Sequence, residues 1–139
     1  MIYALLLDLM MMVFGVVEGR SDAQAINRAA DIDHASGLAE RIGFALVCMA
    51  LLFGLSVCMQ HNTWQLVIGM ALVAYGSFNL TFRLVLNTMR SPRKEWDYVS
   101  LSNNYDTAFV MLFGTWAGRA AYITEACARI AGLVIVTMN

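Results

Sequence analysis

An acidic residue interrupts the apolar run that opens the chain. Asp8 lies between Ile2 and Val17, a stretch whose other residues are hydrophobic or glycine. An aspartate at the centre of a membrane helix costs about 2.5–3.5 kcal/mol on insertion scales, so such residues face protein, become neutral or pair with a cation. We expect Asp8 to face other helices and to pair with an arginine such as Arg119 or Arg129. The pair could serve as a structural link, or it could be a proton or cation site.

A second polar set lies in the last apolar segment. Gly118, Tyr122, Glu125 and Arg129 recur at the spacing of one helix face. Glu125 and Arg129 are also ordered for a favourable i,i+4 ion pair. Gly114 and Gly118 form a GxxxG pattern, which predicts close packing on a neighbouring helix. This face is expected to point into protein or a hydrated cavity, as a register-fixing ion pair or as a conduction path.

The segment "DIDHASGLAER" (31–41) crowds three acids, a histidine and an arginine against the second apolar run. Carboxylates with one histidine could ligate a divalent cation, and the alternative is a solvated helix whose charges pair locally. Whether a metal binds is left open. No GxSxG, P-loop or GxGxxG pattern occurs, so we expect no cofactor and nominate no catalytic residue. A non-enzymatic role is therefore favoured over an enzymatic one.

The composition favours lipid as the main surroundings. Hydrophobic residues make up 60% of the 139 residues and charged residues 14%, where roughly half and about a quarter are typical of soluble domains. Mean hydropathy is +0.63. The net charge of −1 carries no basic field for nucleic acid. We expect an integral membrane protein whose partners are the bilayer and other membrane-embedded chains, its own copies included.

Four apolar segments organise the chain into a single domain, 1–139. The predicted spans are 2–17, 42–59, 64–86 and 107–137. The alanine-rich connector 18–41 favours a helix at the membrane interface, whereas Ser-Pro, Asn-Asn and mixed charge mark 87–106 as a loop. The predicted fold is all-α: a polytopic four-helix transmembrane bundle with an interfacial helical connector.

The basic residues predict the orientation. The first and third connectors carry the arginines and lysine, and the second connector, "QHNT", carries none. Basic residues mark cytoplasmic loops. Both charged connectors are therefore predicted to be cytoplasmic, with both termini outside the cytoplasm and the protein in the inner or cytoplasmic membrane. The basic residues counted are Arg20, Arg28, Arg41, Arg90, Arg93 and Lys94.

Four motifs in fixed order resemble a family of small integral-membrane proteins of tailed phages and bacteria. They are "EGRSDA" (18–23), "HASGLAER" (34–41), "FNLTFRLVLNTMR" (78–90) and "WDYVSLSNNYD" (96–106). The resemblance implies a membrane fold and a grouping of polar residues, and no particular activity. The positions that match the family's pattern are Glu18, Asp22, His34, Arg41, Asn79, Arg83, Arg90, Tyr98, Ser102 and Asp106.

The predicted topology brings the polar helix ends to one side of the membrane. The resulting cluster could be a salt-bridge latch, a cation or phosphate-headgroup site, or the vestibule of a pore. We expect a homo-oligomeric, pore- or transport-related protein. The alternatives are a non-catalytic subunit of a larger membrane complex and, third, a lipid-headgroup enzyme. The predicted cluster comprises Glu18, Asp22, Asp31, His34, Arg41, Arg83, Arg90 and Asp106.

Overall fold

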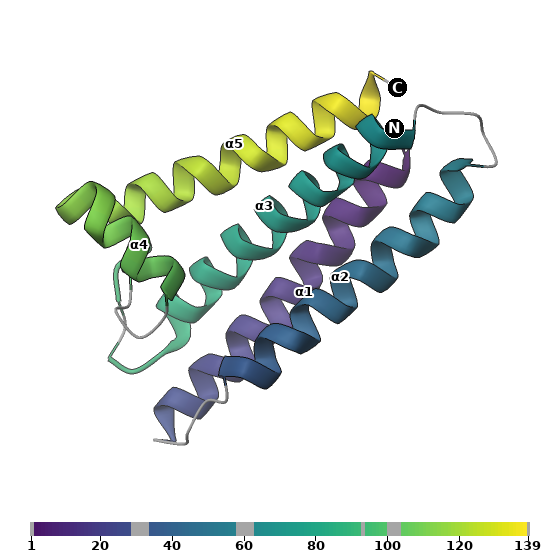
Figure 1. Cartoon of the computed structure of the whole chain (residues 1–139). Helices are drawn as coiled ribbons and strands as arrows, with labels where there is room; N and C mark the ends of the chain where they lie inside the picture. The colour runs from purple at the N-terminus through teal and green to yellow at the C-terminus, as the bar shows by residue number, and fades with distance from the viewer. Residues whose placement is uncertain (1, 29–33, 58–62, 93, 100–103, 139) are drawn as a thin grey trace.

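The computed structural model of the chain is a bundle of long helices (Figure 1). It describes residues 2–28, 34–57, 63–92, 94–99 and 104–138, and these contain helices, turns and loops but no strand. The all-α fold expected from the four apolar segments is confirmed. The elements are α1 (Ile2–Asn27), α2 (His34–Val57), α3 (Thr63–Met89), α4 (Asn104–Phe113), the short 3₁₀ helix η1 (Gly114–Trp116) and α5 (Ala117–Thr137).

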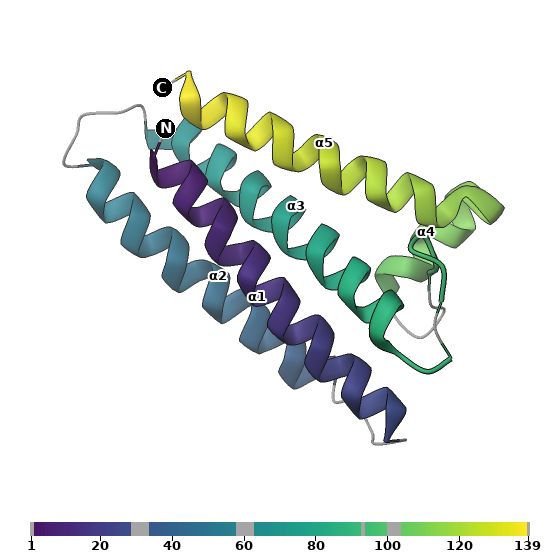
Figure 2. The same cartoon turned by 180° about the vertical axis from the view of Figure 1, so that it is seen from behind.

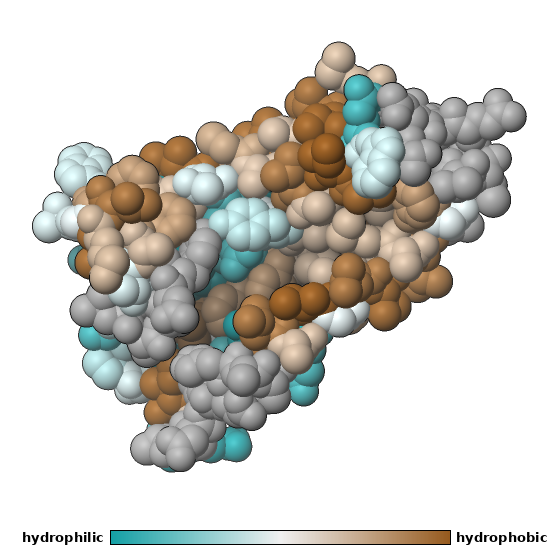
Figure 3. Space-filling model, in the orientation of Figure 1, coloured by the Kyte–Doolittle hydropathy of each residue, from teal (hydrophilic) through white to brown (hydrophobic). Residues whose placement is uncertain are grey.

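Four stretches of helix are long and apolar enough to cross a membrane: Ile2–Asn27, Gly37–Gly54, Trp64–Met89 and Asp106–Thr137. Large hydrophobic side chains along these stretches face outward, and brown apolar residues gather along the bundle in Figure 3. Leu51, for example, is 63% exposed. A surface of this kind fits lipid rather than water, so the protein belongs to the membrane proteins.

Helix α3 lies between α1 and α5 (Figures 1 and 2). Glycines allow these close contacts, because a Cβ added at Gly15 or Gly19 would lie 2.8 Å from the carbonyl oxygens of Phe78 or Phe82. On the other side of α3, a Cβ on Gly132 of α5 would lie 2.5 Å from the Gly69 carbonyl oxygen. Small residues at such positions let helix backbones approach in a membrane. The three helices therefore form the tightly packed part of the bundle.

The bundle has two different ends. The terminal end holds the start of α1, the start of α3 and the last turn of α5 (Figures 1 and 2). The charged end holds the last turns of α1 and α3, where Asn27 Nδ2 donates to the Met89 carbonyl at 3.2 Å. The terminal end is filled by an apolar core, and the polar residues of the predicted cluster that the structure describes lie towards the charged end. The buried core residues nearest the terminal end are Ala4, Leu7, Leu66, Met70, Val73 and Val136.

Helix α2 lies on the outside of this three-helix unit. Among the α2 side chains that the structure describes, only Cys48 and Leu52 are buried. Phe44 stacks on Phe14 of α1 with ring centroids 4.1 Å apart. The helix leaves most of its apolar surface exposed.

Two predicted boundaries change. Residues 18–27 of the first connector continue α1 without a break, so this part of the connector extends the first span and is not a separate interfacial helix. The last segment, predicted as one helix over 107–137, is divided by η1, where Gly114 has a φ of 55°. Glycine adopts this left-handed conformation without steric cost, and the chain bends there between α4 and α5 (Figures 1 and 2).

Candidate functional site: a buried line of ion pairs

Asp8 is held by an arginine from the far end of the sequence. Arg129 of α5 donates Nε–H to Asp8 Oδ1 at 2.8 Å and Nη2–H to Oδ2 at 2.7 Å, and Ser77 of α3 donates its hydroxyl to Oδ1. Asp8 is only 7% exposed. A two-point contact between guanidinium and carboxylate is among the strongest ion-pair geometries. The expected pairing of Asp8 with an intramembrane arginine is confirmed for Arg129.

Gly76 explains how three helices meet at this pair. A Cβ at Gly76 would lie 2.5 Å from the Glu125 carbonyl oxygen and 2.6 Å from the Arg129 backbone nitrogen. The α3 backbone therefore touches α5 between Glu125 and Arg129, and the next residue, Ser77, reaches Asp8. Ser77 is fully buried, but a lone serine in an apolar run gave no signal in the sequence.

A second buried group lies further towards the charged end. Arg83 Nη2 donates to Asp106 Oδ1 at 2.9 Å and to Glu125 Oε1 at 3.2 Å. Glu125 is completely buried, and the side chains of Arg83 and Asp106 are 10% and 8% exposed. This triad joins α3, α4 and α5 through one guanidinium.

The register-fixing pair between Glu125 and Arg129, one of the two alternatives that the sequence left open, does not form. Glu125 turns to Arg83, and Arg129 turns to Asp8. Each buried charge gains a partner on a different helix, whereas a pair within α5 would have left Arg83 and Asp8 without these counterions. The face that carries both residues does pack against protein, since Gly118, Ala121, Glu125 and Gly132 are buried.

A third group stands apart on the other side of the bundle. Arg41 of α2 pairs with Glu18 at 3.3 Å and with Asp22 at 2.8 Å, both on α1. Its guanidinium also lies 4.4 Å from the centroid of the Phe82 ring. These contacts attach the first turns of α2 to α1 and α3.

The predicted polar cluster is therefore divided. The structure brings Glu18, Asp22 and Arg41 into one group and places Arg83 and Asp106 in another, which also includes Glu125. Asp31 lies outside the described residues, as does the side chain of His34. Within the described part of the chain, no three His, Cys, Asp or Glu side chains are placed to hold a metal ion.

Arg90 lies beside the triad, at the end of α3. Its guanidinium stacks 4.1 Å from the centroid of the Tyr98 ring. Burial lowers the pKa of this guanidinium, while Tyr98 and Asp106 act in the opposite direction. Asn87 fixes the loop beneath by donating to the carbonyls of Trp96 and Tyr98 at 3.1 and 2.9 Å.

Three residues expected within the last span, Gly114, Gly118 and Arg119, lie at the bend between α4 and α5. Arg119 pairs with Asp97 at 3.2 Å and its side chain is 56% exposed. Gly114 has open space where a Cβ would stand, and Gly118 packs on the Asp97 carbonyl. The GxxxG of the last segment therefore does not contact a neighbouring helix, because the helix breaks within it. The GxxxG that does so is Gly15–Gly19, whose spacing is visible in "FGVVEG".

The Asp8 group and the triad lie one after the other along α5, and we call them together the buried polar line, although the Arg129 side chain is 33% exposed. Glu125 and Arg129 stand on successive turns of α5, about 6 Å apart along its axis. The line thus runs from Asp106 and Arg83 near the charged end to Asp8, deep in the bundle. Six residues of α1 precede Asp8, or about 9 Å of helix. The apolar core at the terminal end fills this distance and forms an apolar seal.

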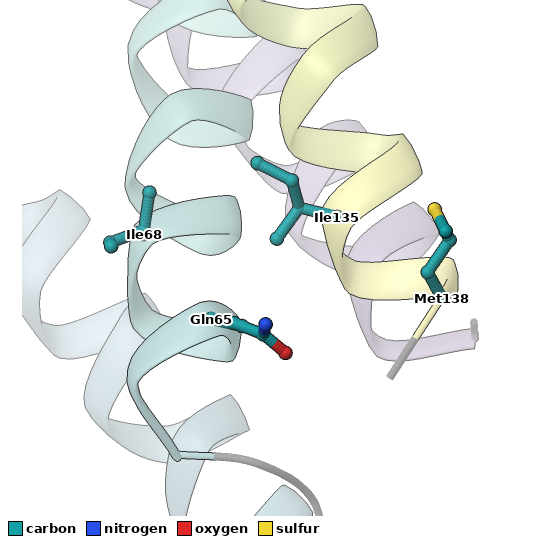
Figure 4. A pocket seen from close by; sticks show the side chains of 4 residues that line it. All are labelled: Gln65, Ile68, Ile135 and Met138. Carbon is teal, nitrogen blue, oxygen red and sulfur yellow. The ribbon is translucent and has the colours of Figure 1, made fainter.

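A shallow pocket of about 400 Å³ lies on the outside of this seal, between α3 and α5 (Figure 4). Ile68 and Ile135 face it from the two helices, with Gln65 and Met138 nearer the end of the bundle. Its four lining residues carry no charge, so this pocket offers no group that could bind an ion or exchange a proton. The buried polar line, by contrast, carries ionisable side chains. No family model, curated protein or solved structure matches this chain.

Proposed function

We propose that the protein translocates protons across the membrane, with Asp8 as the proton-binding residue. The observation that carries the proposal is the set of ion pairs inside the bundle, which extends from Asp106 and Arg83 to Asp8 and stops at the apolar seal. Ionisable side chains inside a membrane are costly and typically mark ion or proton pathways.

The proposed path uses the described residues in order. A proton enters at the charged end, passes along the carboxylates of Asp106 and Glu125, and reaches the Asp8 carboxylate. Protonation of Asp8 removes its negative charge and weakens its contact with Arg129. Release to the other side requires water to enter the apolar seal around Leu7 and Val73. In the present structure this seal is closed, which fits a resting state.

The path lies within one protomer, so it does not depend on the number of copies. The self-association expected from the sequence remains a prediction, as does an accessory role in a larger complex. The accessory role is favoured by one observation, the largely exposed apolar surface of α2. Co-purification in mild detergent tests it, since an accessory subunit brings other chains in fixed ratio.

The direct test is proton flux into liposomes that contain the purified protein. A potassium gradient with valinomycin sets the voltage, and a dye inside the vesicles reports pH. Wild-type protein is expected to acidify the interior faster than empty vesicles. Asp8→Asn is expected to reduce the rate to that of empty vesicles, because the amide cannot exchange a proton in this way.

Two further variants separate loss of function from loss of fold. Glu40→Gln changes an exposed acid of α2 and is expected to leave the flux unchanged. The double variant Asp8→Asn, Arg129→Gln removes both members of the ion pair, so Arg129 is not left without its counterion. A folded double variant that still conducts at the wild-type rate would contradict the proposal.

A further inference from the structure

A cavity of about 540 Å³ lies at the charged end, apart from the buried polar line. One wall is formed by the loop after α3, with Glu95, Asp97 and Tyr98. The other wall is the bend between α4 and α5, with Trp116 and Arg119. The volume is in the range of sites that hold small molecules.

The two walls are fixed to each other by a backbone contact. A Cβ added at Gly118 would lie 1.5 Å from the Asp97 carbonyl oxygen, so only glycine allows this approach. Gly114, which has a positive φ, turns the chain within the second wall. The cavity is therefore a consequence of the backbone path, and not of a chance arrangement of surface side chains.

The loop wall of the cavity lies between two candidate membrane spans, at the level expected for phospholipid headgroups. The apolar stretch of α3 ends at Met89, and the next one begins at Asp106. Trp96 and Trp116 are 49% and 62% exposed in this region. Exposed tryptophans at the end of a membrane helix typically lie at the headgroup level.

The lining offers charges of both signs. Arg119 lies 5.1 Å from the Trp116 ring centroid and donates its Nε–H to Asp97. Because its side chain is 56% exposed, the guanidinium remains accessible to another acceptor. Glu95 is exposed and lines the same cavity. An anion can thus bind at Arg119 while a cation binds at Glu95.

Two more cations increase the attraction for a phosphate. Arg90 and Lys94 lie over the Tyr98 ring, at 4.1 and 5.1 Å from its centroid. They bring positive charge beside the wall that Tyr98 forms. Phosphate contacts with arginine are charge-assisted and strong.

We infer that this cavity binds the headgroup of a zwitterionic phospholipid with a primary ammonium, such as phosphatidylethanolamine. The phosphate binds Arg119, and the ammonium donates hydrogen bonds to Glu95. A choline headgroup has no N–H to donate, and a glycerol headgroup has no cation for Glu95. The inference does not depend on proton translocation, because none of the residues of the buried polar line is in the lining.

Native mass spectrometry of the purified full chain tests the inference. The protein is mixed in detergent with equal amounts of phosphatidylethanolamine, phosphatidylcholine and phosphatidylglycerol of identical acyl chains. Wild type is expected to retain phosphatidylethanolamine preferentially. Arg119→Gln is expected to lower this retention about tenfold, as loss of one charge-assisted contact implies. Glu95→Gln is expected to remove the preference over the other two lipids.

Arg20→Gln serves as the matched control, since Arg20 is an exposed arginine on α1 outside the cavity. It is expected to bind lipid as wild type does. Equal retention of the three lipids by wild type would overturn the inference, and so would an equal loss in Arg20→Gln and Arg119→Gln. Glycerophosphoethanolamine and inorganic phosphate are tested alone. Binding of either as tight as that of the intact lipid would show a soluble ligand and overturn the assignment to lipid.

Discussion

At the scale of single residues, the interior charges are balanced between helices. Asp8 pairs with Arg129, and Arg83 pairs with Asp106 and Glu125. A buried ion pair adds little net stability by itself, but removal of one partner leaves an uncompensated charge. Substitutions in these groups are therefore expected to affect stability strongly.

Arg83→Met is expected to lower the free energy of unfolding by about 3–5 kcal/mol. The reason is that Glu125 and Asp106 would then lose the cation that they share. Thermal unfolding in one detergent measures the change. Arg20→Met, at an exposed position of α1, is expected to change the stability little. The same shift in both variants would show that the triad does not stabilise the fold.

The sequence predicted part of this site, for a physical reason. An aspartate in an apolar run is so costly that an arginine partner within the bundle could be expected, and Arg129 is that partner. The pair Glu125–Arg129 was predicted from proximity along the helix, but proximity does not measure competition from other helices. Ser77 was missed because hydroxyl groups are tolerated in membrane helices and carry no strong signal.

At the scale of helices, glycines decide which faces meet. Gly15 and Gly19 bring α1 to α3, and Gly76 and Gly132 bring α3 to α5. The four spans were predictable from apolar runs, because lipid imposes their length. The break at Gly114 was not, since a glycine within an apolar run fits a continuous helix equally well. Whether the helix continues or breaks depends on the contacts that Asp106 and Gly118 make with other parts of the chain.

Gly76→Ala tests this role. The added methyl would lie 2.5 Å from the Glu125 carbonyl oxygen, so α3 and α5 must separate. Overpacking of this kind typically costs about 1–3 kcal/mol of unfolding free energy. The measurement is thermal unfolding, together with proton flux, because Asp8 and Arg129 meet beside this contact.

Gly43→Ala is the control for this substitution. Gly43 lies in α2 with open space around it, and alanine favours helix over glycine by about 1 kcal/mol. This variant is expected to be as stable as wild type or more stable. Equal destabilisation by both substitutions would contradict the close contact at Gly76.

At the scale of the whole molecule, the arrangement is a tight unit of α1, α3 and α5 with α2 on its outside. The number of spans was predictable from hydropathy. Which helices pack together was not, because α1 and α3 are separated in the chain by α2. The close contacts depend on glycine positions that become informative only once the helices are placed side by side.

The orientation in the membrane is still a prediction from the basic residues. A fusion of alkaline phosphatase after Met138, expressed in bacteria, is expected to be active, since the basic residues predict that the C-terminus lies outside the cytoplasm. A green fluorescent protein at the same site is expected to be dark. The same reporters inserted at 94–99 are expected to give the opposite result. Bright fluorescence from the C-terminal fusion would reverse the topology.

The pair of Asp8 and Arg129 has a consequence for the synthesis of the protein on the ribosome and its insertion into the membrane. The two residues are 121 positions apart, and a ribosome makes α1 long before it makes α5. During this interval the aspartate is in or near the membrane without its counterion. The last helix to be synthesised thus completes the neutralisation of the first. A nascent chain that stops before α5 therefore keeps the Asp8 carboxyl group without its arginine partner.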